Sequence, residues 1–459
     1  MDEKFKKKYH KPAAAPYVWH EKFFSQEEDL LFEKRLCFPS GTLAIWREAL
    51  KFFLPRKKPW SLDELQDKPA FLCAARYYKR GVDVLGHSFK EGAKASQTKI
   101  SFKSIEELLS AFSQEELFLV VDAKFFACWP LLKKVLKPSY FIQNPNEREK
   151  TLEQVSLIVE AYKKQGRGLN IVVMGGGISL DMGAFAASIL ERPLALVPTS
   201  FLAMVDASLG GKNGVNFWPY GKNLIGSFYF PNEMIVCSEF IKTLEAREIR
   251  SGGAEALKHA LLKNDEELLQ RLSLAIASDD RESLLREIPG LLKVKEEVVK
   301  LDPFEKSYRM ILNLGHTLAH GIEALSSAFN QEKEGPALIS HGEAVALGLV
   351  FVVLLSKARG SVSTEYADKV TQEIIQSSCL ISKKDFQLYT GLEPQCKKTW
   401  LVINKYLRQD KKQIELKDSF SDWVLIQSGG FLPGKKNYLS RISSELCEKT
   451  WLELWKLLN

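Results

Sequence analysis

Histidine and carboxylate residues gather in the second half of the 459-residue chain. Glu255 and His259 stand one helical turn apart, and His316 and His320 repeat that i, i+4 spacing, which puts both imidazoles on one helix face. His341 precedes another apolar stretch. One carboxylate with two or three imidazoles suits a catalytic divalent metal, most often zinc. Spacing alone favours His316 and His320 as the ligand pair, although such pairs also arise by chance on amphipathic helices.

A glycine-rich turn follows the apolar segment 170–174. Gly175, Gly176 and Gly177 lead into the helical pattern of residues 179–190. Glycine lets the backbone approach a phosphate, and a helix N-terminus offers N–H groups and a positive dipole end. The pattern GxGxxG is not met, because Leu180 occupies the third glycine position. The turn indicates nucleotide binding, with an ordinary tight strand–helix turn as the alternative.

A glycine-rich and basic stretch covers residues 206–223. It contains four glycines, three asparagines and the lysines Lys212 and Lys222, and we expect a loop there. Lysines and backbone amides in a loop suit a phosphorylated ligand. The alternative is a solvated surface loop, but a loop of this length usually has a function.

The elements that must position these residues follow two patterns. Apolar segments at 117–121, 140–143 and 170–174 alternate with helical patterns at 123–136 and 151–164, which predicts a parallel sheet with crossover helices. Beyond residue 243 helical patterns dominate, and only 423–426 is strand-like. We therefore expect an α/β domain followed by a mainly helical domain. The expected ranges are 1–96 for an N-terminal extension of unknown role, 97–243 for the α/β domain and 244–459 for the helical domain.

Composition limits the functional classes. The chain is 45% apolar and 26% charged, as in ordinary globular proteins. Its longest apolar runs, such as 344–355, are shorter than the roughly 20 residues that span a bilayer, and no secretory signal is visible. The net charge of +7 is modest for this length, and the sequence shows no nucleic-acid-binding motif. An anionic small substrate is therefore favoured over nucleic acid. Seven cysteines without a CxxC pair indicate reduced thiols in a cytoplasmic protein.

Five segments in order carry a resemblance to a known family. They read VPTSFLAMVDASLGGKNGVN (197–216), GKNLIG (221–226), GGAEALKH (252–259), RMILNLGHTLAHGIEA (309–324) and HGEAVALG (341–348). The chain resembles the sugar phosphate cyclase superfamily, and its 3-dehydroquinate synthase family most closely, from about residue 97 to 430. The resemblance implies a Rossmann-like nucleotide-binding domain followed by a helical metal-binding domain, a bound NAD, one zinc (or cobalt) ion and a homodimer.

The resemblance also implies roles for residues that match the family's motifs. The metal ligands become Glu255, His316 and His341, while His320 becomes a substrate contact and His259 leaves the ligand set. The NAD positions are Asp122, Glu147, Lys150, Gly175, Gly176, Gly177, Asp181, Thr199, Ser200, Asp206, Lys212, Lys222 and Thr243. The catalytic and substrate positions are Lys212, Asn223, Lys258, Lys295, Arg309, Asn313 and His320, with Lys412 and Arg192 at the substrate phosphate, Arg192 reaching a neighbouring subunit.

The implied reaction belongs to the shikimate pathway, which leads to chorismate and the aromatic amino acids. A lyase converts 3-deoxy-D-arabino-heptulosonate 7-phosphate to 3-dehydroquinate and phosphate. The steps are NAD-dependent oxidation, β-elimination of phosphate, reduction and an intramolecular aldol closure. Lys295 and Arg309 would fit the substrate carboxylate, because arginine offers a planar two-pronged donor.

Three rivals remain open at this point. They are another cyclase acting on sedoheptulose 7-phosphate or a related sugar phosphate, a metal-dependent polyol dehydrogenase, and an inactive scaffold. The chain departs from the family at Leu180 and Asn213 and in the short link from Arg192 to Thr199. It also carries a longer loop at 217–220, extra residues at 329–339, and no glycine or leucine before Arg309. These departures concern substrate identity more than reaction type.

Overall fold

The computed structural model describes residues 98–458 apart from 114–115, 166–167, 218–220, 306, 331–338, 410–419, 428–429 and 432–438. The expected extension at 1–96 and the expected phosphate contact Lys412 lie outside the described residues. The chain divides into two compact units. The sheet unit contains the described residues up to Thr199 together with Gly210–Cys237, and the helical unit contains Ser200–Leu209 and the described residues from Ser238 onward.

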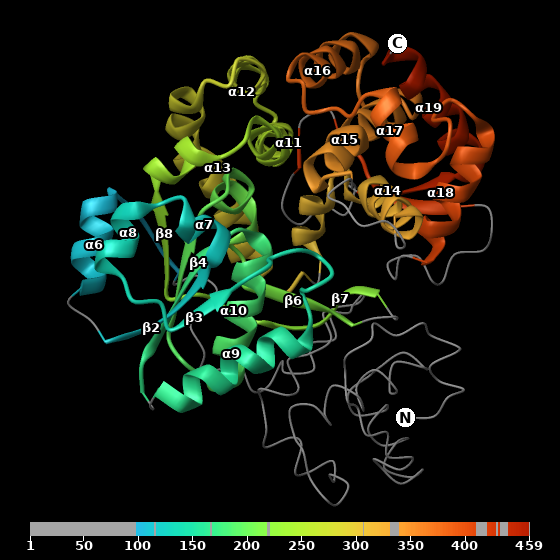
Figure 1. Ribbon diagram of the computed structural model, residues 1–459. Helices are drawn as coiled ribbons and strands as arrows, with labels where there is room; N and C mark the ends of the chain where they lie inside the picture. The colour runs from blue at the N-terminus through green and yellow to red at the C-terminus, as the bar shows by residue number, and fades with distance from the viewer. Residues whose placement is uncertain are drawn as a thin grey trace, which may run out of the picture. The chain divides into compact units, whose positions relative to one another are not determined.

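The sheet unit is built on six parallel strands in the order β1-β8-β5-β4-β2-β3 (Figure 1). The central strand β4 reads NIVVMG and is buried from its second residue, as expected for a parallel strand with both faces covered. The strands are β1 (Lys99–Lys103), β2 (Leu117–Asp122), β3 (Tyr140–Ile142), β4 (Asn170–Gly175), β5 (Leu194–Pro198) and β8 (Glu233–Cys237). The helices are α6 (Ile105–Ser113), α7 (Ala123–Ala127), α8 (Pro130–Val135), α9 (Leu152–Gln165) and α10 (Gly177–Leu190).

Two local predictions in this unit are wrong in detail. The single helix expected at 123–136 is two helices, because Pro130 has no N–H to continue α7 and instead starts α8. The loop expected at 206–223 is partly regular: β6 (Lys212–Phe217) pairs antiparallel with β7 (Gly221–Phe228). Every residue of β6 after Lys212 is buried, including its glycine and two asparagines.

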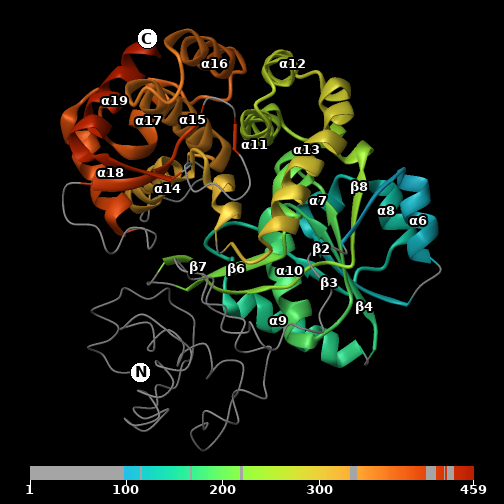
Figure 2. The ribbon, with the colours of Figure 1, turned by 180° about the vertical axis from the view of Figure 1, so that it is seen from behind.

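The helical unit confirms the predicted change of pattern (Figure 2). The helix α15 packs against both α11 and α14. The helices are α11 (Ala246–Lys263), α12 (Glu266–Ala277), α13 (Arg281–Leu301), α14 (His316–Phe329), α15 (His341–Ala358), α16 (Thr364–Gln376), α17 (Lys383–Thr390), α18 (Lys397–Gln409) and α19 (Ser444–Leu457). Short elements are the π-helix η2 (Ala203–Ala207), the 3-10 helices η3 (Ser238–Thr243) and η4 (Tyr308–Asn313), and the hairpin β9 (Phe420–Val424) and β10 (Leu439–Ser443).

An aromatic core fixes α15 within this unit. Phe351 of α15 stacks on Trp400 at 5.7 Å between ring centroids and contacts Trp423 at 5.0 Å. Trp451 continues the cluster from α19 at 6.0 Å from Trp400. By length and composition α15 is apolar enough to cross a membrane, but 78% of it is buried. It is therefore the core helix of the unit, and its first residue is His341.

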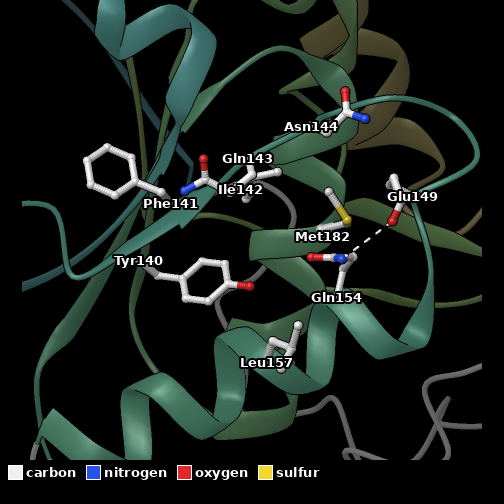
Figure 3. Close-up of a pocket in the computed structure, with 9 residues that line it drawn as sticks. All are labelled: Tyr140, Phe141, Ile142, Gln143, Asn144, Glu149, Gln154, Leu157 and Met182. Carbon is white, nitrogen blue, oxygen red and sulfur yellow. Dashed lines mark hydrogen bonds between the residues drawn. The ribbon is translucent and has the colours of Figure 1, made fainter. Parts of the chain in front are cut away.

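A cavity of about 350 Å³ lies beside the edge strand β3 (Figure 3). Its apolar lining includes Ile142, Leu157 and Met182, and its polar lining includes Gln154, whose amide donates to Glu149 Oε2 at 3.5 Å. None of the residues that the sequence assigns to a site lines this cavity. The charged side chain that lines the cavity is the carboxylate of Glu149, which disfavours a phosphorylated ligand.

Candidate active site

Three helices of the helical unit bring one carboxylate and two imidazoles together. Glu255 lies mid-way along α11, and His316 and His341 are the first residues of α14 and α15. Glu255 Oε1 is 3.3 Å from His316 Nε2 and 3.0 Å from His341 Nε2, and the three donor atoms lie within 4.8 Å of one another. The ring of His320 lies 5.8 Å from that of His316 and stays outside this group. The geometry therefore favours His341 over His320 as the partner of His316 and Glu255, and the ligand set itself stays a prediction.

The protonation states of this cluster suit a cation. Burial opposes ionisation of Glu255, yet the Lys258 ammonium and His316 hold its pKa well below its usual value. Burial lowers the pKa of His316 to about 4, and its Nδ1 faces the carbonyl of Leu314 at 3.1 Å. Burial also opposes protonation of His341, but Glu255 and Glu323 outweigh it and raise its pKa to about 10. Glu255 and His316 are thus ready to bind a divalent metal, and His341 must release a proton to do so.

A second group of charges surrounds Asp206. Its carboxylate lies 3.2 Å from Lys258 Nζ, 2.7 Å from Lys295 Nζ and 3.2 Å from His259 Nε2. Burial would raise the pKa of Asp206, but Lys258, Lys295 and His259 hold it well below its usual value. Asp206, Glu255 and His259 could geometrically form a second metal group. The Lys258 ammonium already lies between Asp206 and Glu255, so a metal there would meet a buried positive charge.

The 3-10 helix η4 contributes the expected carboxylate-binding arginine. Arg309 is 1% exposed, and its guanidinium donates to the carbonyl of Pro303. Burial lowers the pKa of Lys295, and the positive charges of Lys258 and Arg309 lower it further. Asn313 donates to Glu305 Oε1 at 3.0 Å, and Glu305 has a left-handed backbone with φ 56°. The sequence reading missed Glu305, whose unusual backbone conformation is not visible in a residue pattern.

The expected NAD residues of the sheet unit form a hydrogen-bonded group. Lys150 is 5% exposed and donates to Asp181 Oδ2 at 2.5 Å and to Asn223 Oδ1 at 2.8 Å. Asn216 donates to Glu147 Oε1 at 2.9 Å and accepts from the backbone N–H of Asn223 at 2.7 Å. Asn223, expected among the catalytic and substrate positions, therefore accepts a hydrogen bond from Lys150. Asn216 was missed, although it shares the strand β6 with Lys212.

The glycine turn has the features that a pyrophosphate requires. Gly176 is the N-cap of α10 and supplies no side-chain cap, so the first N–H groups of the helix lack a side-chain acceptor from it. A Cβ on Gly175 would lie 2.6 Å from Ser179 Cβ, which keeps the turn at glycine. Ser179 Oγ is buried without a hydrogen-bond partner among the described residues. Leu180 is 2% exposed, so the departure at this position is absorbed by the core. These residues fit a dinucleotide phosphate.

The remaining expected site residues are dispersed. Arg192 donates to the carbonyls of Gly168 at 2.5 Å and Leu169 at 3.3 Å, so its guanidinium is bound within its own chain. Its expected contact with a neighbouring subunit stays a prediction. Asp122 caps α7 by accepting from the N–H of Phe125 at 3.1 Å. The others are Gly177 at the start of α10, Thr199 after β5, Ser200 before η2, Lys212 at the start of β6, Lys222 in β7 and Thr243 at the end of η3.

The chain was compared with known proteins. Profiles of the N-terminal and C-terminal domains of 3-dehydroquinate synthase match residues 140–251 and 252–413. The 3-dehydroquinate synthase of Campylobacter concisus is 38% identical over 340 residues, which cover 72% of this chain and 92% of that one. That of Pyrococcus furiosus is 34% identical, covering 65% and 87%. A bifunctional 3-dehydroquinate synthase/phosphatase of Fusobacterium nucleatum is 38% identical, but only 37% of its length is matched.

Solved structures show the same fold at lower identity. A 2-deoxy-scyllo-inosose synthase, determined with carbaglucose-6-phosphate, NAD+ and Co2+, has a TM-score of 0.62 at 23% identity and covers 77% of this chain and 96% of that one. The 2-epi-5-epi-valiolone synthase of Streptomyces hygroscopicus, with NAD+ and Zn2+, has a TM-score of 0.62 at 22% identity, covering 78% and 97%. These likenesses confirm the predicted fold class. With both domain profiles matching more than half of the sequence, the chain belongs to the 3-dehydroquinate synthase family.

Proposed function

We propose that this chain is a 3-dehydroquinate synthase, a lyase that converts 3-deoxy-D-arabino-heptulosonate 7-phosphate to 3-dehydroquinate and phosphate. Relatives with this name are matched over 92% and 87% of their lengths. The observation that carries the proposal is the group of buried cations Lys258, Lys295 and Arg309 beside the possible metal ligands. Asp206 and Glu255 contact two of these cations, and the five side chains together still carry more positive than negative charge, which favours a substrate with a carboxylate and a phosphate.

The metal site would consist of Glu255, His316 and His341. Lys258 contacts Glu255 Oε2, which leaves Oε1 directed at the two histidines. Two imidazoles and one carboxylate leave further coordination positions open for substrate oxygens. Bound NAD would supply reversible hydride transfer, and a bound zinc or cobalt ion would supply Lewis-acid stabilisation of a substrate oxygen.

The other side chains would bind and orient the substrate and the dinucleotide. Lys295 and Arg309 would hold the substrate carboxylate, with Arg309 as the planar donor. Lys212, Asn223 and His320 would steady the phosphate, whose own oxygens can accept the proton at C6 during elimination. Lys150 and Asp181 would hold the dinucleotide together with the turn at Gly175. Asp206 would keep Lys258 and Lys295 charged and in place.

The rivals differ from this proposal in testable ways. A sister cyclase acts on a sugar phosphate that has no carboxylate. Its substrate would therefore give Lys295 and Arg309 no carboxylate to bind. A polyol dehydrogenase would release one NADH per substrate, whereas a cyclase regenerates NAD+ in each turnover. The sequence relatives at 33–38% identity favour neither rival. We further propose a cytoplasmic homodimer, following the family and the five cysteines that are free in the described part of the chain.

The test is phosphate release from the purified full chain with zinc and a trace of NAD+. The heptulosonate phosphate and sedoheptulose 7-phosphate are supplied in parallel, each with and without a chelator. We expect chelator-sensitive release from the heptulosonate phosphate alone, with 3-dehydroquinate formed and no accumulation of NADH. Release from sedoheptulose 7-phosphate alone would move the chain to a sister cyclase. Stoichiometric NADH would indicate a dehydrogenase, and no release from either substrate would contradict the proposal.

A further inference from the structure

His341 is the least enclosed of the three proposed metal ligands. Its side chain is 34% exposed, against 12% for His316 and 1% for Glu255. Packing therefore fixes the ring of His341 less than it fixes the other two. A metal site requires each donor atom within a few tenths of an ångström, so the position of this ring must be set by something else.

A carboxylate from α14 faces the other nitrogen of this ring. Glu323 Oε1 lies 3.6 Å from His341 Nδ1, while His341 Nε2 points at Glu255. The imidazole is thus held between carboxylates from two different helices. An Nδ1–H directed at Glu323 leaves the Nε2 lone pair for a metal. Carboxylates in this position orient ligating histidines and increase their basicity.

An ion pair fixes the helical turn that carries His341. Arg247 of α11 contacts Glu343 of α15 with both prongs, Nε to Oε1 at 3.0 Å and Nη2 to Oε2 at 2.8 Å. Glu343 also accepts from the N–H of Ser340 at 2.7 Å in a capping box. This pair ties the first turn of α15 to the helix that carries Glu255.

Close backbone packing strengthens the same contact between α11 and α15. The N–H of Gly342 donates to Ser251 Oγ at 3.2 Å. A Cβ on Gly342 would lie 2.3 Å from the Ser251 carbonyl oxygen, so a side chain there would push the helices apart. The first turn of α15 is therefore held on α11 at two successive residues, Gly342 and Glu343.

We infer that Glu323 is a positioning residue for the metal: its carboxylate sets the ring of His341, and the Arg247–Glu343 pair sets the helical turn beneath that ring. The inference rests on the ligand set given under the proposed function and extends it to side chains that do not touch the metal. Loss of the Glu323 charge should weaken metal binding while leaving the three donor atoms in the chain.

The test measures zinc affinity of the purified full chain by competition with a chromogenic chelator. The variants are Glu323→Gln, Glu323→Asp and Arg247→Lys, with His341→Ala to remove a ligand. Glu287→Gln is the matched control, because Arg271 and Glu287 form another ion pair between two helices at 2.9 Å. The visible spectrum of the Co2+-loaded protein reports the ligand geometry, and thermal unfolding of metal-free protein reports folding.

We expect Glu323→Gln to bind zinc about 10- to 100-fold more weakly with an altered Co2+ spectrum. Arg247→Lys should show a smaller loss, Glu323→Asp should recover part of the affinity, and Glu287→Gln should match the wild type. Wild-type affinity and spectrum in Glu323→Gln would overturn the inference while leaving the ligand set intact. Equal zinc binding by the wild type and His341→Ala would instead refute the ligand set. If Glu323→Gln does not fold, wild-type zinc affinity and an unchanged Co2+ spectrum in Glu323→Asp, whose carboxylate is one methylene shorter, would also overturn the inference.

Discussion

The two units hold their charged groups in different ways. In the sheet unit, Lys150 donates one hydrogen bond to Asp181, whose side chain is 17% exposed, and one to Asn223. In the helical unit, Lys258 and Glu255 are each 1% exposed and contact each other. Lys258 also contacts Asp206, and Glu255 also contacts His316 and His341. Water can reach the Asp181 carboxylate if Lys150 is lost, but it cannot reach the Glu255 carboxylate if Lys258 is lost.

This difference sets the cost of removing one residue. A buried charge without its partner is strongly unfavourable, whereas a partly exposed charge is solvated. The helical unit should therefore respond to single substitutions with combined loss of stability and of metal. The sheet unit should lose dinucleotide binding with smaller changes in stability.

The largest effect is expected for Glu255→Ala. It removes a proposed ligand and leaves the buried Lys258 ammonium facing only Asp206. We expect the free energy of unfolding to fall by about 3–5 kcal/mol, together with loss of bound metal and of turnover. Urea unfolding and elemental analysis measure these changes. Full metal occupancy in the variant would refute the ligand assignment.

Arg309→Ala comes next and tests substrate choice. Arg309 is buried beside Lys295, where a substrate carboxylate would gain a charged hydrogen bond. We expect kcat/KM for the heptulosonate phosphate to fall about 10- to 100-fold, with a much smaller change for any residual activity on sedoheptulose 7-phosphate. Arg309→Lys keeps the charge and controls for folding. Equal losses with both substrates would remove the basis for assigning a carboxylate ligand.

Lys150→Met tests the sheet unit. It breaks hydrogen bonds to Asp181 and Asn223, which lie at the proposed dinucleotide site. We expect weaker NAD+ binding and about 1–3 kcal/mol less stability, with metal content unchanged. Lys99→Met is the matched control, because Lys99 makes an exposed ion pair with Glu233 in the same unit. A drop in metal content equal to that of Glu255→Ala would contradict the separation of roles between the units.

The smallest expected effect is the release of protons when zinc binds. Because Glu255 and Glu323 raise the pKa of His341 to about 10, its ring is protonated in metal-free protein at pH 6, whereas His316, with a pKa of about 4, is neutral. Zinc binding at about pH 6 should release about one proton, and affinity should rise with pH. Calorimetry in two buffers of different ionisation enthalpy measures this release. No release would contradict the charge state given to His341.

Sequence patterns predicted the fold class, and together with the family motifs they predicted a site whose residues still await a test. Alternating apolar strands and helices gave the parallel sheet, and Pro130 marked a helix boundary that the apolar pattern had hidden. The proposed metal ligands lie on three helices, so no local spacing could distinguish His341 from His320 as a ligand. The family motifs favoured His341. Glu305, Glu323 and the Arg247–Glu343 pair were missed because their partners are distant in sequence or depend on backbone conformation.

The most direct test of the metal centre is anomalous diffraction at the zinc edge from crystals of the full chain grown with zinc. The account predicts one anomalous peak within bonding distance of Glu255 Oε1, His316 Nε2 and His341 Nε2, with Lys258 on the other carboxylate oxygen of Glu255. A peak bound by His320 in place of His341, or by Asp206 and His259, would contradict it.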